Sequence, residues 1–220
     1  MCGRFNYVIS EGMVNLFDEF GVPMTGSTRY NLAPTEQVPI IRQASVKPQS
    51  MEARWWLVPN WSNGPSNQFS MFNARCETLD SSRAFREPFK HKRCLIPATS
   101  YIEWKNEANH KQAYEIYSEG PLLFAGIWDE WNGELTSCAM VTTQANEALA
   151  PIHKRMPVML NIKQGKKWMD MSTPCDDLKS LFHADLEMPI HYHMVDHSIG
   201  NVHNKTKPIK ISRCQNMSLF

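Results

Sequence analysis

Residues 93 to 142 read RCLIPATSYIEWKNEANHKQAYEIYSEGPLLFAGIWDEWNGELTSCAMVT, and this stretch decides the fold. It contains four runs of apolar and β-branched residues, at Arg93–Pro97, Ala113–Tyr117, Leu122–Trp128 and Leu135–Thr142. Glycine, proline and asparagine stand between the runs, and such residues are typical of turns. Short apolar runs separated by turns predict strands of a mostly antiparallel sheet.

The segments around this stretch add strands and short helices. Further strands are predicted at Val38–Arg42, Glu52–Val58 and Ile190–Val195. The clearest helix covers Ser10–Phe20, where apolar residues at positions 13, 16, 17 and 20 follow a capping serine. Shorter helices are predicted at Glu77–Phe85, Gln144–Ala150, Ile162–Met171 and Asp176–His183. Because helices and strands do not alternate regularly, the sequence predicts an α+β fold with a sheet or barrel-like core and short flanking helices.

Length and composition limit the class of protein. The chain has 220 residues, 42% of them apolar, which is enough for one substantial core, so we expect a single domain over residues 2–220. No apolar run approaches the roughly 20 residues that cross a bilayer, and the N-terminus lacks the apolar core of a signal peptide. The sequence therefore predicts a cytoplasmic protein rather than a membrane or secreted one.

The six cysteines, at positions 2, 76, 94, 138, 175 and 214, show no Cys-x-x-Cys pair and no regular spacing. This pattern argues against a zinc ribbon or a disulfide framework and fits a reducing compartment. Cys94 and Cys138 stand within apolar runs and are predicted to be core residues. His191 and His193 share one face of a predicted strand, but two ligands are too few for a metal site, so no metal is predicted.

Charge is nearly balanced overall but uneven along the chain. With 23 Lys and Arg against 22 Asp and Glu, the formal net charge is +1. Residues 83–93 carry Arg83, Arg86, Lys90, His91, Lys92 and Arg93 against one acidic residue, and the chain after Asp196 carries Lys205, Lys207, Lys210 and Arg213 against none. Such stretches are either solvated surface or parts of a groove that binds nucleic acid.

The N-terminus offers distinctive chemistry once Met1 is removed, as is usual before a small side chain. Cys2 then carries a thiol and a free α-amine on adjacent carbons. An α-amine has a pKa of about 7.7–8.0 against about 10.4 for lysine, so more of it is neutral and nucleophilic at pH 7. It can form an imine with an aldehyde, after which the thiol closes a thiazolidine ring. The thiol can instead attack an amide carbonyl with the amine as its base, and an unreactive terminus is the third interpretation.

Three internal segments also carry groups suited to catalysis. Asn73 lies in Phe72–Thr78, at a predicted junction of strand and helix, where a polar turn is the alternative. Glu103 lies between two apolar residues, and strand alternation turns it to the opposite face, as a solvated residue or as a general acid/base in a cleft. His153 lies in a loop between two prolines, where a histidine is either inert or functional.

These segments, in their order and spacing, resemble the SOS response-associated peptidase (SRAP) family, and the resemblance extends over nearly the whole chain. It rests on Met1–Phe5, Arg29–Thr35, Trp55–Trp61, Phe72–Thr78, Arg93–Pro97 with Tyr101–Trp104, Ile152–Val158 and Gly200–Val202. Two features depart from the family pattern. Trp56 replaces a glycine, and the loop between Trp61 and Asn73 is longer than in the bacterial relative.

The resemblance implies an abasic-site sensor with a self-processing peptidase activity. Cys2, exposed by autocatalytic loss of Met1, would form a thiazolidine crosslink with the ring-opened aldehyde of an abasic site in single-stranded DNA. Asn73 would hold the N-terminal residue and the opened sugar. Glu103 would move protons at the amine and the sugar. His153 would contact the sugar or its phosphate and assist ring opening, crosslink reversal or the β-elimination of an abasic-site lyase.

The resemblance also implies how DNA is bound. Arg4, Arg75, Arg83 and Arg155 match family arginines that grip phosphates through charge-assisted hydrogen bonds, and Trp61 matches an aromatic residue that stacks on a base. The implied protein is a monomer that needs no metal or cofactor. Two other functions stay open: an N-terminal-nucleophile amidohydrolase, because glutamine amidotransferases also begin Met-Cys-Gly, and a non-covalent reader of modified DNA.

Overall fold

The computed structural model describes residues 2–44, 47–66, 68–107, 110–182 and 188–211. Its strands are β1 Arg4–Tyr7, β2 Arg29–Leu32, β3 Gln37–Gln43, β4 Pro48–Trp55, β5 Asn73–Arg75, β6 Arg93–Glu107, β7 His110–Trp131, β8 Leu135–Gln144, β9 Arg155–Pro157 and β10 His191–Val195. Its helices are α1 Glu11–Glu19, α2 Arg86–His91, α3 Ile162–Met169 and α4 Cys175–Leu178, with 3₁₀ turns η1 Cys76–Thr78, η2 Lys179–Phe182 and η3 His197–Gly200. The predictions on Met1, His183, Arg213 and Cys214 lie outside the described residues.

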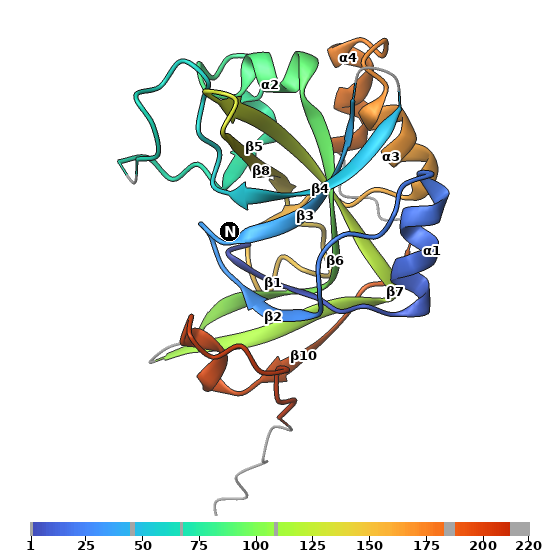
Figure 1. The fold of residues 1–220 in the computed structure, drawn as a ribbon. Helices are drawn as coiled ribbons and strands as arrows, with labels where there is room; N and C mark the ends of the chain where they lie inside the picture. The colour runs from blue at the N-terminus through green and yellow to red at the C-terminus, as the bar shows by residue number, and fades with distance from the viewer. Residues whose placement is uncertain (1, 45–46, 67, 108–109, 183–187, 212–220) are drawn as a thin grey trace, which may run out of the picture.

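All ten strands join one sheet, in the order β10-β7-β8-β4-β3-β6-β1-β2, with β5 and β9 paired to β8. Since β6 also pairs with β7, the strands from β7 through β8, β4 and β3 to β6 form a ring. Most pairs are antiparallel, while β4 and β5 run parallel to β8. Figure 1 shows α1 and α3 on one side of the sheet and α2 and α4 at its upper end. The predicted α+β class and mostly antiparallel sheet are confirmed.

The two predicted strands Ala113–Tyr117 and Leu122–Trp128 are one strand, β7, in the structure. The pairing of β6 with β7 shifts register between Ala98↔Leu122 and Ser100↔Tyr117, so the residues between them form an irregularity inside a continuous strand. Gly120 and Pro121 lie in this irregularity. Residues that are typical of turns therefore indicate a bulge here rather than the end of a strand. A bulge tolerates proline, although proline has no N–H group to donate to the neighbouring strand.

Two of the helix predictions are confirmed by their caps. Ser10 Oγ accepts a hydrogen bond from the N–H of Met13 (3.2 Å) at the start of α1. Asn161 and Gln164 form a reciprocal capping box at the start of α3. Asp176–His183 is predicted as one helix, and its described part is α4 followed by η2.

Two helix predictions are wrong. Residues 77–85 form the rest of η1 and turns, and the helix begins only at Arg86. Pro88 lies in the first turn of this helix, where main-chain N–H groups have no partner within the helix, so the missing N–H group of proline costs no helical hydrogen bond. Residues 144–150 form turns rather than a helix. The side chain of Asn146 there accepts a bond from the N–H of Leu149 (3.0 Å), a local alternative to helix propagation.

Arg93 at the start of β6 ties two helix ends to the sheet. Its side chain is buried and donates to four main-chain carbonyl oxygens: Nε to Trp168 (2.6 Å), Nη2 to Asp170 (2.6 Å), and Nη1 to Phe89 (2.9 Å) and Lys90 (3.0 Å). These carbonyls lie at the C-terminal ends of α2 and α3, where helices leave acceptors unpaired and favour a positive charge. The guanidinium group therefore fixes both helices against the core.

We expect Arg93→Met to lower the free energy of unfolding by about 2–4 kcal/mol, because the substitution leaves several buried carbonyl groups unpaired. Denaturant unfolding followed by tryptophan fluorescence measures the change. The matched control is Arg86→Met on α2, one of the two helices that Arg93 contacts, since the Arg86 side chain is about half exposed and lies 3.8 Å from Glu87. Equal stabilities of the two variants would contradict the role assigned to Arg93.

Within the described ranges, no helix has the length and apolar character needed to cross a membrane.

Candidate active site

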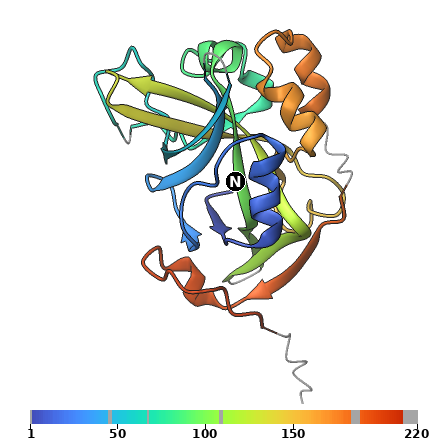
Figure 2. The same ribbon diagram turned by 45° about the vertical axis from the view of Figure 1, so that its right-hand side comes forward.

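The N-terminal segment is positioned by β1, which pairs antiparallel with β6. Arg4 lies opposite Ile102 and Phe5 opposite Tyr101, so the chain before Arg4 runs alongside Glu103. β1, labelled in Figure 1 and dark blue in both Figure 1 and Figure 2, lies among the other strands. Cys2 is 1% exposed and Glu103 is 4% exposed, so both are shielded from bulk water.

Asn73 holds the main chain of Cys2. It begins β5, which pairs in parallel with β8 through Asn73↔Met140. Its buried side chain donates from Nδ2 to the carbonyl oxygen of Cys2 (2.8 Å). The segments 72–78 and 2–4, far apart in the sequence, therefore meet at this bond.

Glu103 points away from its neighbours on β6, as strand alternation predicts. Ile102 packs with Ala113, Val195 and Ile199 in a small second core, against which Trp104 also lies. Glu103 faces the other way, and its Oε1 accepts a bond from the N–H of Trp104 (3.2 Å). The carboxylate thus lies on the side of the sheet that carries the N-terminus.

His153 lies beside this carboxylate, with its Nδ1 3.9 Å from Oε2 of Glu103. The same nitrogen is 3.0 Å from the N–H of Arg155 and 3.2 Å from the carbonyl oxygen of Arg155. A neutral ring can accept from the N–H group, and a protonated ring can donate to either oxygen. Nδ1 therefore faces both the main chain of Arg155 and the carboxylate of Glu103.

Glu103 and His153 border an open cleft of about 350 Å³, which is also lined by Arg4, Trp104, Asn106, Lys111 and Gly200. The guanidinium of Arg4 lies 5.9 Å from the ring centre of Trp104 and donates from Nη1 to the carbonyl oxygen of Gly3 (3.1 Å). Two cationic side chains beside an acid/base pair suit a ligand that carries negative charge.

The thiol of Cys2 is held in its protonated form. Burial raises its pKa, and the negative charge of Glu103 raises the pKa further. Its Sγ lies 3.7 Å from the carbonyl oxygen of Arg4, the acceptor for the S–H group. The thiol is therefore not present as a free thiolate before the reaction. Either another group is the attacking nucleophile, or the thiol loses its proton as it attacks.

Arg155 is already engaged within the chain. It forms a two-point ion pair with Glu77, from Nη1 to Oε1 (2.5 Å) and from Nη2 to Oε2 (3.0 Å), and Nη2 also donates to the carbonyl oxygen of Thr142 (2.7 Å). The hydrogen bond with Arg155 lowers the pKa of Glu77. Arg75, by contrast, is exposed on β5 beside Asn73.

Trp61 and Arg83 lie in a different hollow. The Arg83 guanidinium lies 4.1 Å from the ring centre of Trp61, and both line a groove of about 470 Å³ together with residues of the segments 57–66 and 68–71. Trp61 and Phe69 are 50% and 63% exposed there, and Phe69 is an aromatic residue that sequence reasoning missed. The unexpected Trp56 braces these two segments, since it packs on Phe72 (5.5 Å between ring centres) and donates to the carbonyl oxygen of Ser66 (3.1 Å).

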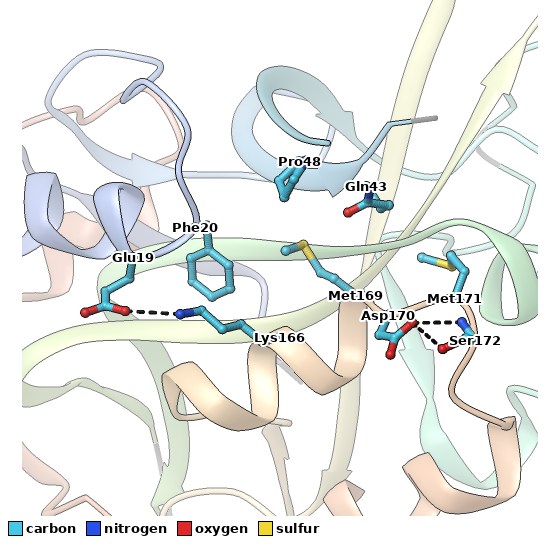
Figure 3. A pocket seen from close by; sticks show the side chains of 9 residues that line it. All are labelled: Glu19, Phe20, Gln43, Pro48, Lys166, Met169, Asp170, Met171 and Ser172. Atoms are coloured by element: carbon cyan, nitrogen blue, oxygen red, sulfur yellow. Dashed lines mark hydrogen bonds and ion pairs between the residues drawn. The ribbon is translucent and has the colours of Figure 1, made fainter. Parts of the chain in front are cut away.

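A larger cavity, of about 520 Å³, lies at the end of α1 and the start of the segment after α3, and Figure 3 shows its side chains. Lys166 there pairs with Glu19 (3.2 Å), and Asp170 accepts bonds from the main chain and side chain of Ser172. Its charges are satisfied by one another, and none of the predicted site residues lines it. It is therefore a weaker candidate for catalysis than the cleft at Glu103.

The described residues contain no group of three or more His, Cys, Asp or Glu side chains that could hold a metal ion. His193 lies 3.2 Å from Glu115 across the β10–β7 pair. Cys94 and Cys138 are fully buried, which confirms their prediction as core residues.

The structure thus gathers Cys2, Asn73, Glu103, His153 and Arg4 at one place, and leaves Trp61 and Arg83 in another groove. Sequence reasoning missed Lys111 and gave Gly200 no role of its own, and neither has a local signal, because only the folded sheet and the C-terminal segment bring them to the cleft. Together the fold and the site define a protein in which Cys2 is buried within a mixed sheet, near Glu103, His153 and Arg4.

The chain belongs to the SOS response associated peptidase (SRAP) family, whose model matches residues 1–202. It is 33% identical over 192 residues to the abasic site processing protein YoqW of Bacillus subtilis, covering 82% of this chain and 86% of YoqW. It is 29% identical over 185 residues to the abasic site processing protein YedK of Escherichia coli, covering 80% of this chain and 81% of YedK. A crystal structure of a Bacteroides thetaiotaomicron protein shares the fold, with a TM-score of 0.76, 24% identity and coverage of 88% of this chain and 93% of that one.

Proposed function

We propose that this chain processes abasic sites in single-stranded DNA by forming a covalent thiazolidine link through Cys2. The observation that carries the proposal is the meeting of Asn73, Glu103 and His153 around the N-terminal segment. Asn73 fixes the Cys2 main chain, and the acid/base pair shares an open cleft with Arg4. The names of the relatives YoqW and YedK as abasic site processing proteins support the coarser part of the proposal, that abasic sites are processed.

The first step is removal of Met1 by the chain itself. Water is consumed as the Met1–Cys2 peptide bond breaks, and the α-amine of Cys2 is released. The amine then attacks the aldehyde carbon of the ring-opened abasic sugar, and loss of water gives an imine. Glu103 takes and returns the protons in these exchanges.

The second step closes the ring. The Cys2 sulfur bonds to the imine carbon and the thiol proton passes to the nitrogen, which gives a thiazolidine. The protonated thiol suits this order, because the thiol brings the proton that the nitrogen needs. An amidohydrolase, in contrast, would attack first with a thiolate, and burial together with Glu103 opposes that ion. His153 assists opening of the sugar. A lyase reaction follows where, before the ring closes, the imine loses a proton from the next carbon, the C–O bond to the 3′-phosphate breaks, and the cleaved strand leaves as a phosphate while a C=C bond forms.

DNA is held by Arg4, Arg75, Arg83 and Arg155 on phosphates and by Trp61 on a base. The contact of Arg83 with Trp61 gives the groove along the segments 57–66 and 68–71 both a positive charge and an aromatic face. Arg155 would have to exchange Glu77 for a phosphate, because its Nε is buried and both Nη atoms are bonded within the chain. We expect the chain to act as a monomer without a metal or cofactor.

The central experiment incubates the purified chain with a single-stranded oligonucleotide that carries one abasic site. We expect a heat-stable adduct on a denaturing gel and a mature mass that begins at Cys2, because an acylated nitrogen cannot form the imine. The matched control is the same strand with a tetrahydrofuran analogue, which has no aldehyde. Adduct formation by chains that retain Met1 would overturn the mechanism, while tight binding without any adduct would leave a non-covalent reader.

We expect a preference for single strands, because a lesion within a duplex has to be unstacked at a cost of a few kcal/mol. Binding should weaken with salt, and each phosphate contact contributes about 0.7 to the slope of log K against log salt. Arg75→Gln should lower the slope by about that amount, whereas Lys163→Gln on the exposed face of α3 should not. Fluorescence anisotropy with the tetrahydrofuran strand measures both. A slope unchanged by Arg75→Gln would count against its phosphate contact.

A further inference from the structure

One wall of the cleft comes from the chain that follows β10. After Asp196 this segment forms η3 and a series of turns, and it returns to β10 through the isolated bridge Val195↔Lys210. The segment lies at the foot of the molecule in both Figure 1 and Figure 2, beside β7 and β10. Because residues 197–209 pair with no strand ladder, other bonds have to fix their position.

Asn31 supplies those bonds. Its fully buried side chain points Nδ2 at three main-chain carbonyl oxygens, those of Ile199 (3.1 Å), Asn201 (2.9 Å) and Asn204 (2.9 Å). Its own carbonyl oxygen accepts a bond from Nζ of Lys205 (2.9 Å). One residue of β2 therefore holds the whole segment 199–205.

The main chain of Asn31 is shaped for this task. Its φ of 52° is in the left-handed region, where asparagine is one of the few side chains that is tolerated. The β1–β2 register is irregular there, and the N–H of Asn31 donates to the side chain of Asn6 (2.8 Å) instead of a strand carbonyl. Asn6 is in turn bound to Ser100 (2.8 Å) and Glu115 (3.0 Å), so the support reaches β6 and β7.

Gly200 is the point where this segment meets the cleft, beside Arg4, Glu103 and His153. A Cβ atom added at Gly200 would have no heavy atom within 4 Å, and its φ is not in the left-handed region. In contrast, a Cβ at Gly126 or Gly165 would come within 2.9 Å of a neighbouring side chain. The fold therefore requires glycine at those two positions but not at Gly200, where the missing side chain only keeps the cleft open.

We propose that the segment Ile199–Asn204 is a wall along which the sugar-phosphate backbone of a single strand passes, closest at Gly200, and that Asn31 is its positioning residue. Glycine permits this kind of close approach by a ligand backbone. In the described chain after Asp196, Lys205 pairs with Glu36, Lys207 and Lys210 are exposed and no residue is acidic, and Arg4 and Lys111 also line the cleft. The inference rests on the proposed function for the identity of the ligand as DNA.

The test compares Gly200→Phe with the matched control Gly120→Phe. Gly120 also has open space around a Cβ and no left-handed φ, and it lies in the irregularity of β7. Two substrates are used for covalent capture: a single-stranded abasic oligonucleotide and 2-deoxyribose 5-phosphate, which has the same aldehyde without flanking nucleotides. Binding of an undamaged single strand is measured by anisotropy.

For Gly200→Phe we expect binding of the undamaged strand to weaken by about tenfold, comparable to the loss of one or two phosphate contacts. The loss in capture rate should be at least about tenfold greater on the oligonucleotide than on the sugar phosphate, since only the strand has to pass the wall. Gly120→Phe should match the wild-type chain. Equal losses on the two substrates, or no loss on either, would overturn the proposal.

Asn31→Asp tests the positioning role with almost no change of shape, because carboxylate oxygens would replace the amide that faces three carbonyls. We expect faster trypsin cleavage after Lys205 and an oligonucleotide affinity that falls while the maximal capture rate changes little. Should the wild-type chain form no covalent adduct, the proposed chemistry fails, yet strand binding by Gly200→Phe and Asn31→Asp still decides whether the wall contacts DNA. Unaltered strand affinity in both variants would refute it.

Discussion

Replacing Cys2 by serine should abolish the heat-stable adduct with an abasic single strand. Oxygen in place of sulfur closes an oxazolidine ring, which hydrolyses far more readily than a thiazolidine. The α-amine is retained, so imine formation should continue and reverse. Adding cyanoborohydride, which delivers hydride to the imine carbon, should restore an adduct for Cys2→Ser by fixing the C–N bond. The yield of adduct on a denaturing gel, with and without the reductant, measures both effects.

Cys76→Ser is the matched control, because Cys76 is a half-buried free cysteine on η1 and lies outside the cleft. It should give the wild-type yield of adduct. A heat-stable adduct from Cys2→Ser at that same yield, without reductant, would remove the thiol from ring closure. Loss of adduct even with the reductant would show that the substitution had impaired the amine as well, and would contradict the separation of the two groups.

The geometry explains why a buried, protonated thiol is compatible with this reaction. Burial and Glu103 raise the pKa of Cys2, so the S–H group survives across neutral pH. The α-amine released with Met1 is nucleophilic only in its neutral form, so it becomes a better nucleophile as the pH rises. Capture is therefore expected to accelerate through the titration of the amine rather than through that of the thiol.

The orientation of Glu103 could be predicted from the sequence, because alternation along a strand depends only on local geometry. The residues that surround Glu103 in the folded chain could not be predicted in this way. Cys2 reaches Glu103 through β1, which was not predicted, and Asn73 through β5, which was expected only as the end of a strand and whose parallel pairing with β8 was not predicted. Short strands carry little periodicity, and their partners are set by the whole sheet.

The same limit explains the two helix errors and the missed wall. At Gln144–Ala150 a local side-chain bond from Asn146 competes with the helix, and at Glu77–Phe85 the helix starts later than its composition suggests. Gly200 and Asn31 lie in segments quoted for the family resemblance, but 169 positions separate them, by the difference of their numbers. Only the folded chain joins them, through three carbonyl groups that carry no sequence signal.

Glu103→Gln should slow adduct formation by about 10²–10⁴, the usual value of a positioned general acid/base. The amide keeps the size of the carboxylate and its acceptor for the N–H of Trp104, yet it cannot move protons at the amine. His153→Ala should still form the thiazolidine. The opening of the sugar, the cleavage of the strand or the release of the crosslinked DNA should change instead, because His153 contacts the sugar side of the cleft in the proposed mechanism. A time course of adduct and of cleaved strand, followed by a chase with unlabelled abasic strand, separates the two variants.

Matched controls are Glu119→Gln and His91→Ala, both at exposed positions that do not line the cleft. The 3.9 Å separation of Glu103 and His153 makes a distinction between them informative, since an acid/base pair that acts as one unit would lose the same step whichever member is removed. Identical time courses for Glu103→Gln and His153→Ala would therefore replace the division of labour with a single coupled pair. Wild-type behaviour of both variants would place the proton transfers at the amine and the sugar on groups other than Glu103 and His153.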